Sequence, residues 1–364
     1  MSGDNKISAD DTIRYGVIGA GMMGVEHIEN LLSVDGVEVT AVSDPDEERR
    51  DIGVAAAGGR IPAFAHHDQL LDSNLVDAVV IASPNFTHVD VLADVLQSDV
   101  HVLIEKPLCT TTEDCKATIE RANGRKGKVW MGLEYRYMPP VTRLIDEVHA
   151  GAVGDVKMVA IREHRFPFLV KVGDWNRFTR NTGGTWVEKC CHFFDLMNQI
   201  VGDKPISVFS TGGQVVNHLD EVYDGETSDI LDSGYVLVDY PNQVRALLDL
   251  CMFAEATKNQ EEISVVGTSG KAEALIPENV LRLGRRCEHS IGSVEEHSVH
   301  DDRVKVEGLH HGSSYLEHVD FADAIRNDTE PLVTLEDGLW SVAIGEAAHR
   351  SNAEGRVVQL SELL

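Results

Sequence analysis

The sequence predicts an α/β protein of two domains: a doubly wound parallel sheet first, then an α/β domain with a large, mostly antiparallel, open-faced sheet. In the first half, short apolar runs alternate with helical patterns, as in parallel sheets covered on both faces. In the second half, amphipathic strands follow one another through hairpin-type turns, which favours antiparallel pairing. The 364 residues are enough for two separate cores.

The elements of the first half are predicted from apolar runs and helical periodicity. Strands are expected at 13–18, 37–43, 76–82, 101–105 and 128–133, and helices at 23–32, 46–57, 88–97 and 112–122. The run VDAVVIA at 76–82 is almost continuously apolar, as buried parallel strands are. The double proline at 139 and 140 marks the passage into the second domain. We therefore expect a flexible tail at 1–11, a dinucleotide-binding domain at 12–137 and a second domain at 138–364.

A glycine-rich turn, GVIGAGMMG, places Gly19, Gly21 and Gly24 in the spacing G-x-G-x-x-G. It follows a strand and opens a helix, and Asp44 ends the next strand, so a dinucleotide site is favoured over a plain tight turn. The phosphates would lie at the helix N-terminus, where free N–H groups favour anions. Because a carboxylate at Asp44 can accept from both ribose hydroxyls and would repel a 2′-phosphate, we expect NAD rather than NADP.

Composition restricts the class of partner. The formal net charge is −28, with 60 acidic and 32 basic residues, which disfavours binding to nucleic acid or to an anionic membrane. This acidity fits an ordinary cytoplasmic enzyme or one adapted to high salt. Six cysteines without a C-x-x-C pair predict a reduced, cytoplasmic setting, and the polar N-terminus shows no secretory signal.

Two further motifs follow strands of the predicted parallel sheet, ASPNFTH at 82–88 and EKP at 105–107. With the glycine turn, they make the sequence resemble the glucose–fructose oxidoreductase / inositol dehydrogenase (Gfo/Idh/MocA) family from about residue 13 to the C-terminus. The resemblance implies a Rossmann domain, an α/β domain, and nicotinamide-dependent chemistry at an alcohol or ketone of a sugar or cyclic polyol. It also implies oligomers formed through the open face of the second sheet.

Cofactor-binding residues are expected beyond the carboxyl ends of the parallel strands. The expected set is Gly19, Ala20, Gly21, Met22, Met23, Gly24, Asp44, Ser83, Pro84, Asn85, His88, Glu105, Lys106 and Glu134. The resemblance implies that Lys106 lies beside the reacting carbon, where an ammonium can stabilise a developing alkoxide; a solvated lysine in a surface turn is the alternative. The resemblance also places Glu134, where the family often has asparagine, near the nicotinamide.

In the segment GGTWVEKCCHFFDLMNQIVG at 183–202, Gly183 and Gly184 precede a predicted helix with an apolar stripe facing the core. Glu188 and His192 lie four residues apart, so they share a face beside that stripe. An imidazole can accept a proton near neutral pH, and the resemblance implies that His192 is the catalytic base, with Glu188 where the family has an aspartate. Glu188 equally fits a capping box with Thr185.

The remaining candidates for substrate binding, besides Lys106 and His192, are Tyr135, Arg136, Trp175, Asn176, Lys189 and Tyr315. Arg136 matches the second arginine of the family pattern, Tyr135 replaces the first, and Tyr315 is included by family analogy. Trp175 and Asn176 lie in a predicted loop and suit a sugar ring, although loop anchoring fits Trp175 equally well. Lys189 has no family counterpart, and a solvent-facing position is its alternative.

The second domain is predicted to be rich in strands. They are expected at 157–164, 206–212, 234–240, 243–253, 262–268, 271–277 and 280–286, and helices at 314–326 and 336–352. Their one-sided apolar pattern leaves a face that a second subunit could cover, which predicts a homodimer or homotetramer. No metal site is predicted, because neighbours such as Cys190 and His192 rarely converge on one ion and the histidines at 308–318 lack a set of carboxylates.

The predicted function, as the resemblance implies, is NAD-dependent interconversion of a secondary alcohol and a ketone on a sugar or cyclic polyol. Two alternatives stay open. One is a keto-sugar or keto-glycoside reductase that uses the same site, since residues do not display the direction of a reaction. The other is a non-catalytic NAD-binding regulator on the same fold.

Overall fold

The computed structural model of the protein describes residues 11–287, 289 and 291–364. The expected N-terminal tail therefore lies outside the described residues, apart from Asp11. The chain forms two compact units. Unit 1 contains the chain up to Cys109 together with 113–134 and 303–339, and unit 2 contains 110–112, 135–302 and 340–364. Residues 303–339 lie within the range expected for the second domain, 138–364, but they belong to unit 1.

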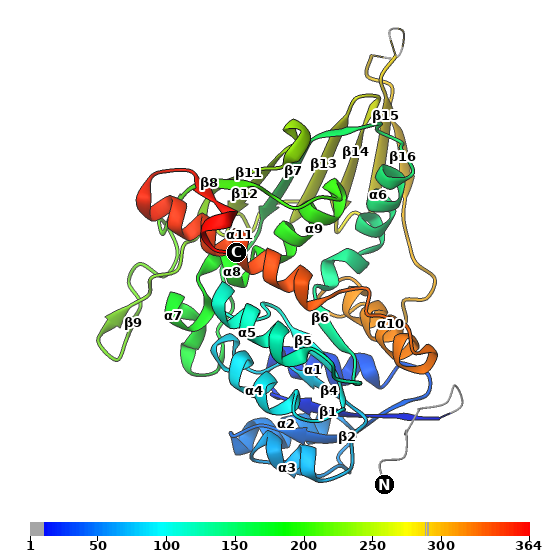
Figure 1. The fold of residues 1–364 in the computed structure, drawn as a ribbon, viewed down its shortest axis with the longest axis vertical. Helices are drawn as coiled ribbons and strands as arrows, with labels where there is room; N and C mark the ends of the chain where they lie inside the picture. The colour runs from blue at the N-terminus through cyan, green and yellow to red at the C-terminus, as the bar shows by residue number, and fades with distance from the viewer. Residues whose placement is uncertain (1–10, 288, 290) are drawn as a thin grey trace. The chain divides into compact units, whose positions relative to one another are not determined.

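Unit 1 is built on a six-stranded parallel sheet in the order β3-β2-β1-β4-β5-β6 (Figure 1). Its strands are β1 (Ile13–Ile18), β2 (Val37–Ser43), β3 (Ala63–Phe64), β4 (Ala78–Ile81), β5 (His101–Glu105) and β6 (Val129–Gly132). Its helices are α1 (Met22–Leu31), α2 (Glu47–Ala56), α3 (His67–Asp72), α4 (His88–Val95), α5 (Thr112–Ala122) and α10 (Ser313–Asn327). The strand order reverses between β1 and β4, where doubly wound sheets bind dinucleotides. The predicted doubly wound sheet is confirmed.

Burial explains why these strands read as continuous apolar runs. All four residues of β4 are buried, because helices cover both faces of the sheet. Helix α1 contacts α2 and α10, whereas α3 contacts α4. Phe321 of α10 packs against Tyr15 of β1 and Trp130 of β6, with ring centroids 6.2 and 5.7 Å apart. Helix α10 is therefore part of the core of unit 1.

Unit 2 contains a nine-stranded sheet in the order β16-β15-β14-β13-β7-β12-β11-β8-β17. Its strands are β7 (Val156–His164), β8 (Ser207–Gly213), β11 (Ser233–Asp239), β12 (Arg245–Cys251), β13 (Glu261–Gly267), β14 (Gly270–Ile276), β15 (Val280–Arg285), β16 (Glu295–Ser298) and β17 (Val358–Gln359). A separate pair is β9 (Val222–Tyr223) and β10 (Glu226–Thr227). The large sheet is antiparallel except where β7 pairs with β12. The predicted mostly antiparallel sheet is confirmed.

The helices associated with unit 2 are α6 (Pro139–His149), α7 (Thr179–Thr182), α8 (Thr185–Glu188), α9 (Cys191–Val201) and most of α11 (Leu335–Glu354). Helix α6 contacts β14 and β15, and α9 contacts β7. Alternate residues of the strands face these helices. In β11, Val236 and Val238 are buried, whereas Tyr235 and Leu237 are 53% and 49% exposed. One face of the sheet therefore forms a core and the other stays open in the single chain.

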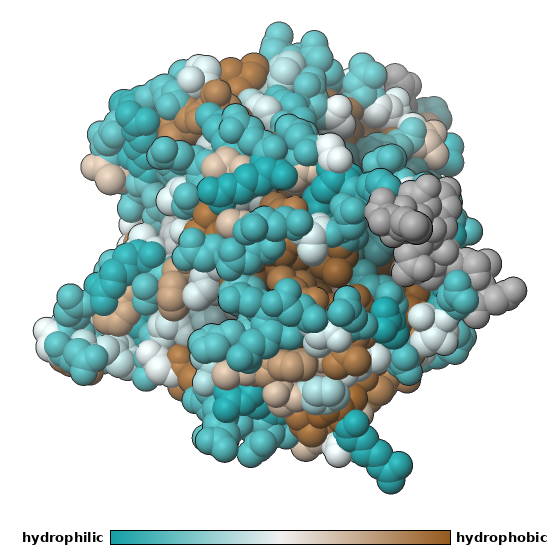
Figure 2. All heavy atoms as spheres, turned by 60° about the horizontal axis from the view of Figure 1, so that its bottom comes forward, coloured by the Kyte–Doolittle hydropathy of each residue, from teal (hydrophilic) through white to brown (hydrophobic). Residues whose placement is uncertain are grey.

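Helix α6 is absent from the sequence prediction, because its two prolines were interpreted as the passage between domains. Pro139 and Pro140 instead occupy its first turn, where a missing N–H costs no intrahelical hydrogen bond. No helix in the described part of the chain is long and apolar enough to cross a membrane. Figure 2 shows a face on which hydrophilic residues predominate, with smaller hydrophobic areas between them.

Candidate active site

The glycine turn joins β1 to α1 and leaves room for a ligand only at its middle glycine. Gly19 has φ +93°, and a Cβ there would lie 2.7 Å from the Ala82 carbonyl carbon. A Cβ at Gly24 would collide with the Gly19 carbonyl oxygen. A Cβ at Gly21, by contrast, would meet nothing within 4 Å. The turn therefore uses two glycines for its own packing and leaves Gly21 open to close approach by a bound group.

The start of α1 has the properties of an anion site. Gly21 is its N-cap residue and provides no side chain to satisfy the free N–H groups of the first turn. Asp44, just beyond β2, accepts hydrogen bonds from the backbone N–H groups of Ala20 at 2.8 Å and Asp46 at 2.9 Å. The Arg50 guanidinium donates to the backbone carbonyl oxygen of Asp44. The turn and the carboxylate are thus held together, as a pyrophosphate and a ribose would require.

The turn after β4 carries Asn85 and His88, both buried. The Nδ2 atom of Asn85 has no hydrogen-bond partner among the described residues. His88 lies within hydrogen-bond distance of the Ser83 carbonyl oxygen, at 3.0 Å, and the Pro107 carbonyl oxygen, at 2.8 Å. Burial lowers the pKa of His88. A neutral imidazole has one N–H, so in that form His88 donates to only one of these two carbonyl oxygens. Asn85 therefore presents an unsatisfied donor at the edge where a cofactor is expected.

Glu105 ends β5 and connects Lys106 to a buried pair of histidines. Its Oε2 accepts from the Lys106 backbone N–H at 3.1 Å, and its Oε1 lies 2.8 Å from Nε2 of His27. Nδ1 of His27 lies 2.8 Å from Nε2 of His318. Burial opposes ionisation of Glu105, but the hydrogen bond and charge of His27 outweigh it and hold the pKa of Glu105 at about 2. Lys106 therefore follows a fixed, ionised carboxylate.

Glu134 follows β6, which pairs with β5 in the sheet, and belongs to a second buried group of acids and a histidine. Its Oε1 lies 3.9 Å from Nε2 of His310, whose Nδ1 lies 3.2 Å from Oε1 of Glu26. Burial and the charge of Glu105 raise the pKa of Glu134 to about 7, although His310 and Lys106 oppose the shift. This carboxyl group therefore changes charge near neutral pH at the carboxyl edge of the sheet.

Several residues of these two groups escaped prediction from the sequence. His310 and His318 belong to the segment 308–318, for which no metal site was predicted, and no role was predicted for Glu26 and His27 in the helix expected at 23–32. The proximity of four histidine and glutamate residues to the EKP motif depends on α10 packing against α1, which no local spacing displays. Tyr315, expected near the substrate, is buried in unit 1, and its hydroxyl donates to the Ser33 carbonyl oxygen at 3.4 Å.

In unit 2, the helix expected after Gly183 and Gly184 is broken into α8 and α9. Gly183 and Gly184 both have positive φ, and α8 starts at Thr185 with Gly184 as its N-cap residue. The Thr185 hydroxyl donates to the Leu231 carbonyl oxygen at 2.7 Å, and no side chain caps α8. The capping-box interpretation of Glu188 is therefore wrong, because Thr185 lies within the helix and not at its N-cap. Glu188 is buried, with 5% of its surface exposed.

His192, in the first turn of α9, is 2% exposed and stacks on Tyr135, with ring centroids 4.0 Å apart and planes 8° apart. The Tyr135 hydroxyl accepts from Nζ of Lys189 at 2.7 Å. Lys189 also pairs with Glu163 of β7 at 3.0 Å, so it does not face solvent. Arg136 Nε donates to Asp195 Oδ2 at 2.6 Å. Tyr135, Lys189 and His192 thus form one buried cluster with Glu163, and Arg136 is paired with Asp195 of α9.

Asn176 and Trp175 lie in a 3₁₀ segment, Val172–Arg177, where a loop was expected. The Asn176 side chain is fully buried, and its Nδ2 donates to the Leu169 carbonyl oxygen at 3.0 Å. The Trp175 carbonyl oxygen accepts from Nδ2 of Asn181 at 2.9 Å. These bonds hold the segment to its own neighbours in unit 2.

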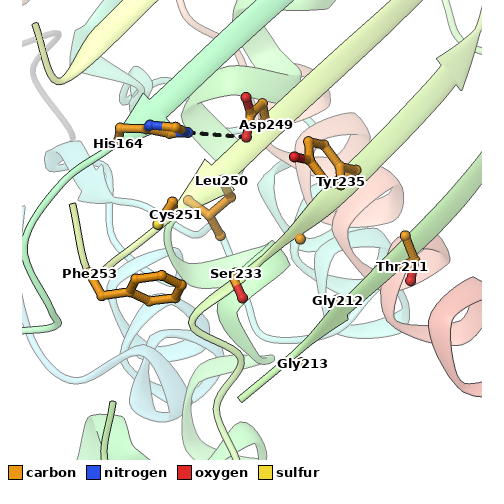
Figure 3. A pocket seen from close by; sticks show the side chains of 11 residues that line it. His164, Thr211, Gly212, Gly213, Ser233, Tyr235, Asp249, Leu250, Cys251 and Phe253 are labelled. Carbon is orange, nitrogen blue, oxygen red and sulfur yellow. Dashed lines mark hydrogen bonds and ion pairs between the residues drawn. The ribbon is translucent and has the colours of Figure 1, made fainter. Parts of the chain in front are cut away.

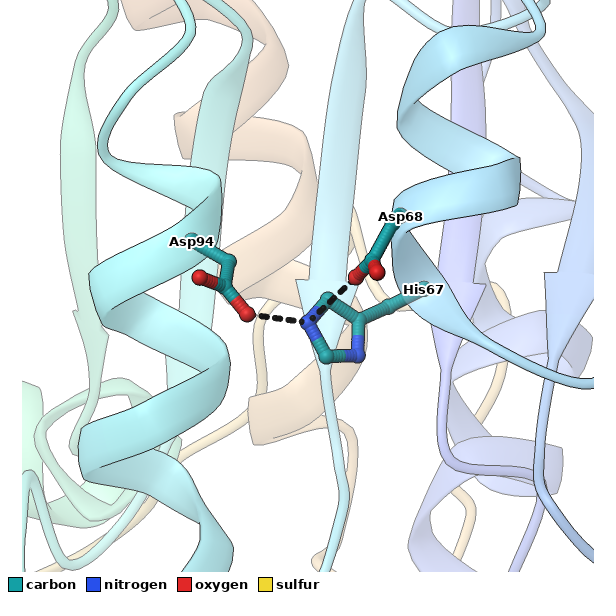
Figure 4. A group of neighbouring side chains, drawn as sticks. All are labelled: His67, Asp68 and Asp94. Carbon is teal, nitrogen blue, oxygen red and sulfur yellow. Dashed lines mark hydrogen bonds and ion pairs between the residues drawn. The ribbon is translucent and has the colours of Figure 1, made fainter.

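A group of possible metal ligands lies on α3 and α4 of unit 1. Nε2 of His67 lies 2.9 Å from Asp94 Oδ2 and 3.1 Å from Asp68 Oδ1 (Figure 4). Both aspartates are exposed to solvent. Two exposed carboxylates around one imidazole are explained by ion pairing at a surface, so we assign no metal to them.

The two halves of the sequence match models of one family. The model described as "Oxidoreductase family, NAD-binding Rossmann fold" matches residues 13–133, and "Oxidoreductase family, C-terminal alpha/beta domain" matches residues 145–360. The chain belongs to the Gfo/Idh/MocA oxidoreductase family. This confirms the resemblance, and it confirms NAD as the cofactor of an oxidoreductase.

Relatives within the Gfo/Idh/MocA family match part or all of the chain. The rhizopine catabolism protein MocA of Rhizobium meliloti is 30% identical over 53% of this chain and 58% of its own length. The myo-inositol 2-dehydrogenase of Thermotoga maritima is 27% identical over 97% of this chain and its full length. The structure of levoglucosan dehydrogenase with NADH and levoglucosan superposes with a TM-score of 0.85 over 96% of this chain and 99% of that one. Its 17% identity shows a shared fold alone.

Proposed function

We propose that this Gfo/Idh/MocA family member oxidises a secondary alcohol of a sugar or cyclic polyol to the ketone with NAD, or catalyses the reverse reaction. The observation that carries this proposal is the match along the full length of a myo-inositol 2-dehydrogenase, combined with Lys106 at the end of β5 and His192 on α9. A non-catalytic NAD-binding protein would have no need for both residues.

The residues around the glycine turn fit NAD. Gly21 leaves space for a pyrophosphate, the first turn of α1 supplies N–H donors, Asp44 supplies a ribose acceptor, and Asn85 supplies an unsatisfied donor. Ala20, Met22, Met23, Ser83, Pro84, His88, Glu105 and Glu134 complete the proposed set. When bound, NAD accepts the two electrons of the alcohol as a hydride.

The chain's own residues handle the proton and the oxygen. His192 is proposed to accept the hydroxyl proton, and stacking on Tyr135 fixes the plane of its ring. Lys106 is proposed to stabilise the negative charge that develops on the oxygen, and Glu105 fixes its backbone. Glu188 is proposed to assist His192. Arg136, Trp175, Asn176, Lys189, Tyr135 and Tyr315 remain proposed substrate-binding or supporting residues.

The test is incubation with NAD or NADP and a panel of polyols and pyranoses, with the absorbance of NADH as readout. Lys106→Met and His192→Asn should each lower kcat by at least about a hundredfold, the usual size of one acid–base or oxyanion contribution. Their Kd for NAD should stay close to that of the unmodified protein. Exposed Lys204→Met and His297→Asn are the matched controls. Near-normal turnover in both test variants would refute the assignment, and NAD binding without turnover on any substrate would favour a regulator.

We also propose that the protein forms a homodimer or homotetramer through the open face of the unit 2 sheet. Exposed apolar side chains gather on that face at Met158, Phe209, Tyr235, Leu237 and Val266. In the strand register, Leu237 lies opposite Phe209, and Val266 opposite Met158. An exposed apolar area of this kind is typical of a subunit interface. Six cysteines without a C-x-x-C pair fit the reducing cytoplasm as its location.

The same face contains an open hollow of about 470 Å³ (Figure 3). Tyr235, His164 and Asp249 line it, and Nε2 of His164 lies 3.1 Å from Oδ1 of Asp249. The hollow provides a recess into which side chains of a second copy could pack.

A further inference from the structure

Two buried glutamates face each other across the sheet of unit 2. Glu163 of β7 and Glu261 of β13 are directly opposite in the antiparallel register, on the face covered by helices. They are 0% and 5% exposed. Like charges in directly opposed strand positions repel, and a buried carboxylate requires a counter-charge or a proton.

The contacts of the pair leave one oxygen of each carboxyl group without a hydrogen-bond donor in the described part of the chain. Nζ of Lys189 and Nη1 of Arg165 both contact the same oxygen, Oε1 of Glu163, at 3.0 and 3.3 Å. Oε2 of Glu163 and Oε2 of Glu261 are buried and have no donor among the described side chains. The two carboxyl groups are within hydrogen-bond reach of each other. One shared proton turns this unfavourable contact into a hydrogen bond and satisfies both groups.

The surroundings of Glu261 favour its protonated form near neutral pH. Burial and the charge of Glu163 raise the pKa of Glu261 to about 8, although Lys189 and Arg165 oppose the shift. The charged or titratable groups that face the pair are Lys189 from the turn between α8 and α9, Arg165 beyond β7, and Tyr135 through Lys189.

The pair is linked by short contacts to the proposed base. Lys189 bridges Glu163 and the Tyr135 hydroxyl, and the Tyr135 ring stacks on His192 at 4.0 Å. We propose that Glu163 and Glu261 share one proton, and that this charge state holds Lys189 on Tyr135 and so positions His192 for catalysis. Glu163, Glu261, Lys189 and Tyr135 are then positioning residues. The inference rests on the proposed function of His192.

Loss of the shared proton has a predictable effect. An ionised Glu261 offers Lys189 a second carboxylate on the neighbouring strand and draws the ammonium away from the Tyr135 hydroxyl. The tyrosine then loses the hydrogen bond from Lys189, and the stacked imidazole loses its fixed plane. Alcohol oxidation should therefore decline at alkaline pH for a reason that is separate from the titration of the base itself.

The experiment compares kcat of Glu261→Gln with that of the unmodified protein from pH 6 to pH 9.5. Glutamine has the shape of the protonated acid and cannot ionise. Titrations of other groups affect both proteins equally, so they cancel when kcat of Glu261→Gln is divided by kcat of the unmodified protein. The ratio should be constant below pH 7 and rise by up to about tenfold by pH 9, because one unit above its pKa a group is about ten times more often ionised. Glu262→Gln, one residue along β13 on the open face, is the matched control and should follow the unmodified profile.

A second measurement does not depend on activity. With glutamate labelled at the side-chain carboxyl carbon, the unmodified protein should show a buried carboxyl resonance that titrates near pH 8 and is absent in Glu261→Gln. A flat kcat ratio, or no carboxyl titration between pH 6 and 9, overturns the inference. If His192→Asn keeps full activity, the proposed function fails, while the NMR result still decides whether the proton is shared.

Discussion

The backbone N–H of Ala20 donates to Oδ2 of Asp44 at 2.8 Å, which fastens the glycine turn to the end of β2. The carboxylate therefore has two tasks. It fixes the turn on which we propose that the pyrophosphate binds, and its other oxygen, held by the Asp46 N–H, lies where the proposed ribose contact requires an acceptor.

Replacing Asp44 should change the cofactor preference. In Asp44→Asn, an acceptor for Ala20 is kept and the charge that repels a 2′-phosphate is lost. We expect the ratio of kcat/KM for NAD to that for NADP to fall about ten- to a hundredfold, the value of one to two charge-assisted hydrogen bonds. Steady-state kinetics with both cofactors measures it. An unchanged ratio would show that Asp44 does not select the cofactor.

Two glycines of the turn, Gly21 and Gly24, should respond differently to alanine. Gly21→Ala should keep the thermal stability of the unmodified protein, since its Cβ meets nothing within 4 Å, yet weaken NAD binding by about tenfold or more. Gly24→Ala should lower the free energy of unfolding by about 1–3 kcal/mol, because its Cβ collides with backbone. Thermal denaturation and calorimetric titration with NAD separate the two effects. Normal NAD affinity in Gly21→Ala would mean that no pyrophosphate lies on this turn.

Glu134 should make stability depend on pH. Its pKa is raised from 4.5 to about 7 in the folded protein, so between these values the folded state holds a proton that the unfolded state releases. The free energy of unfolding should therefore decrease as pH rises from about 4.5 to 7. Glu134→Gln has no carboxyl group to titrate, so its free energy of unfolding should not show this decrease. The free energy of unfolding of Glu134→Gln minus that of the unmodified protein should therefore increase by up to about 3 kcal/mol between pH 5 and pH 8. Urea denaturation at each pH measures the free energy of unfolding. Glu38→Gln, at an exposed position, is the control. If the difference in free energy of unfolding between Glu134→Gln and the unmodified protein does not change with pH, the prediction is contradicted.

Leu237→Asp should dissociate the proposed oligomer. The substitution places a charge on the open face of the sheet beside Phe209, where burial against a second subunit would leave it unpaired. Size-exclusion chromatography with light scattering should show a smaller species, at little cost to the stability of the single chain. Leu332→Asp, exposed elsewhere and outside the sheet, should retain the size of the unmodified protein. If both variants elute like the unmodified protein, the sheet face is not the interface.

The sequence predicts the elements of unit 1 well, because apolar strands and glycine turns are local signals. The bounds of β1, β2, β5 and α5 agree with the expected ranges. The break between α8 and α9 was missed, since Lys189 and Cys190 are compatible with a helix and only the surrounding burial shows the turn. The pairing of Glu163 with Glu261 was also beyond reach, because it depends on the register of strands about a hundred residues apart in the chain.

Helix α10 has a practical consequence for dissecting the molecule. A fragment that stops at the end of the first family match would leave the apolar surface of Tyr15 and Trp130 without Phe321. It would also separate His27 from His318. A NAD-binding fragment that folds by itself must therefore carry residues 303–339 grafted back through a short linker, and simple truncation should yield an aggregating product.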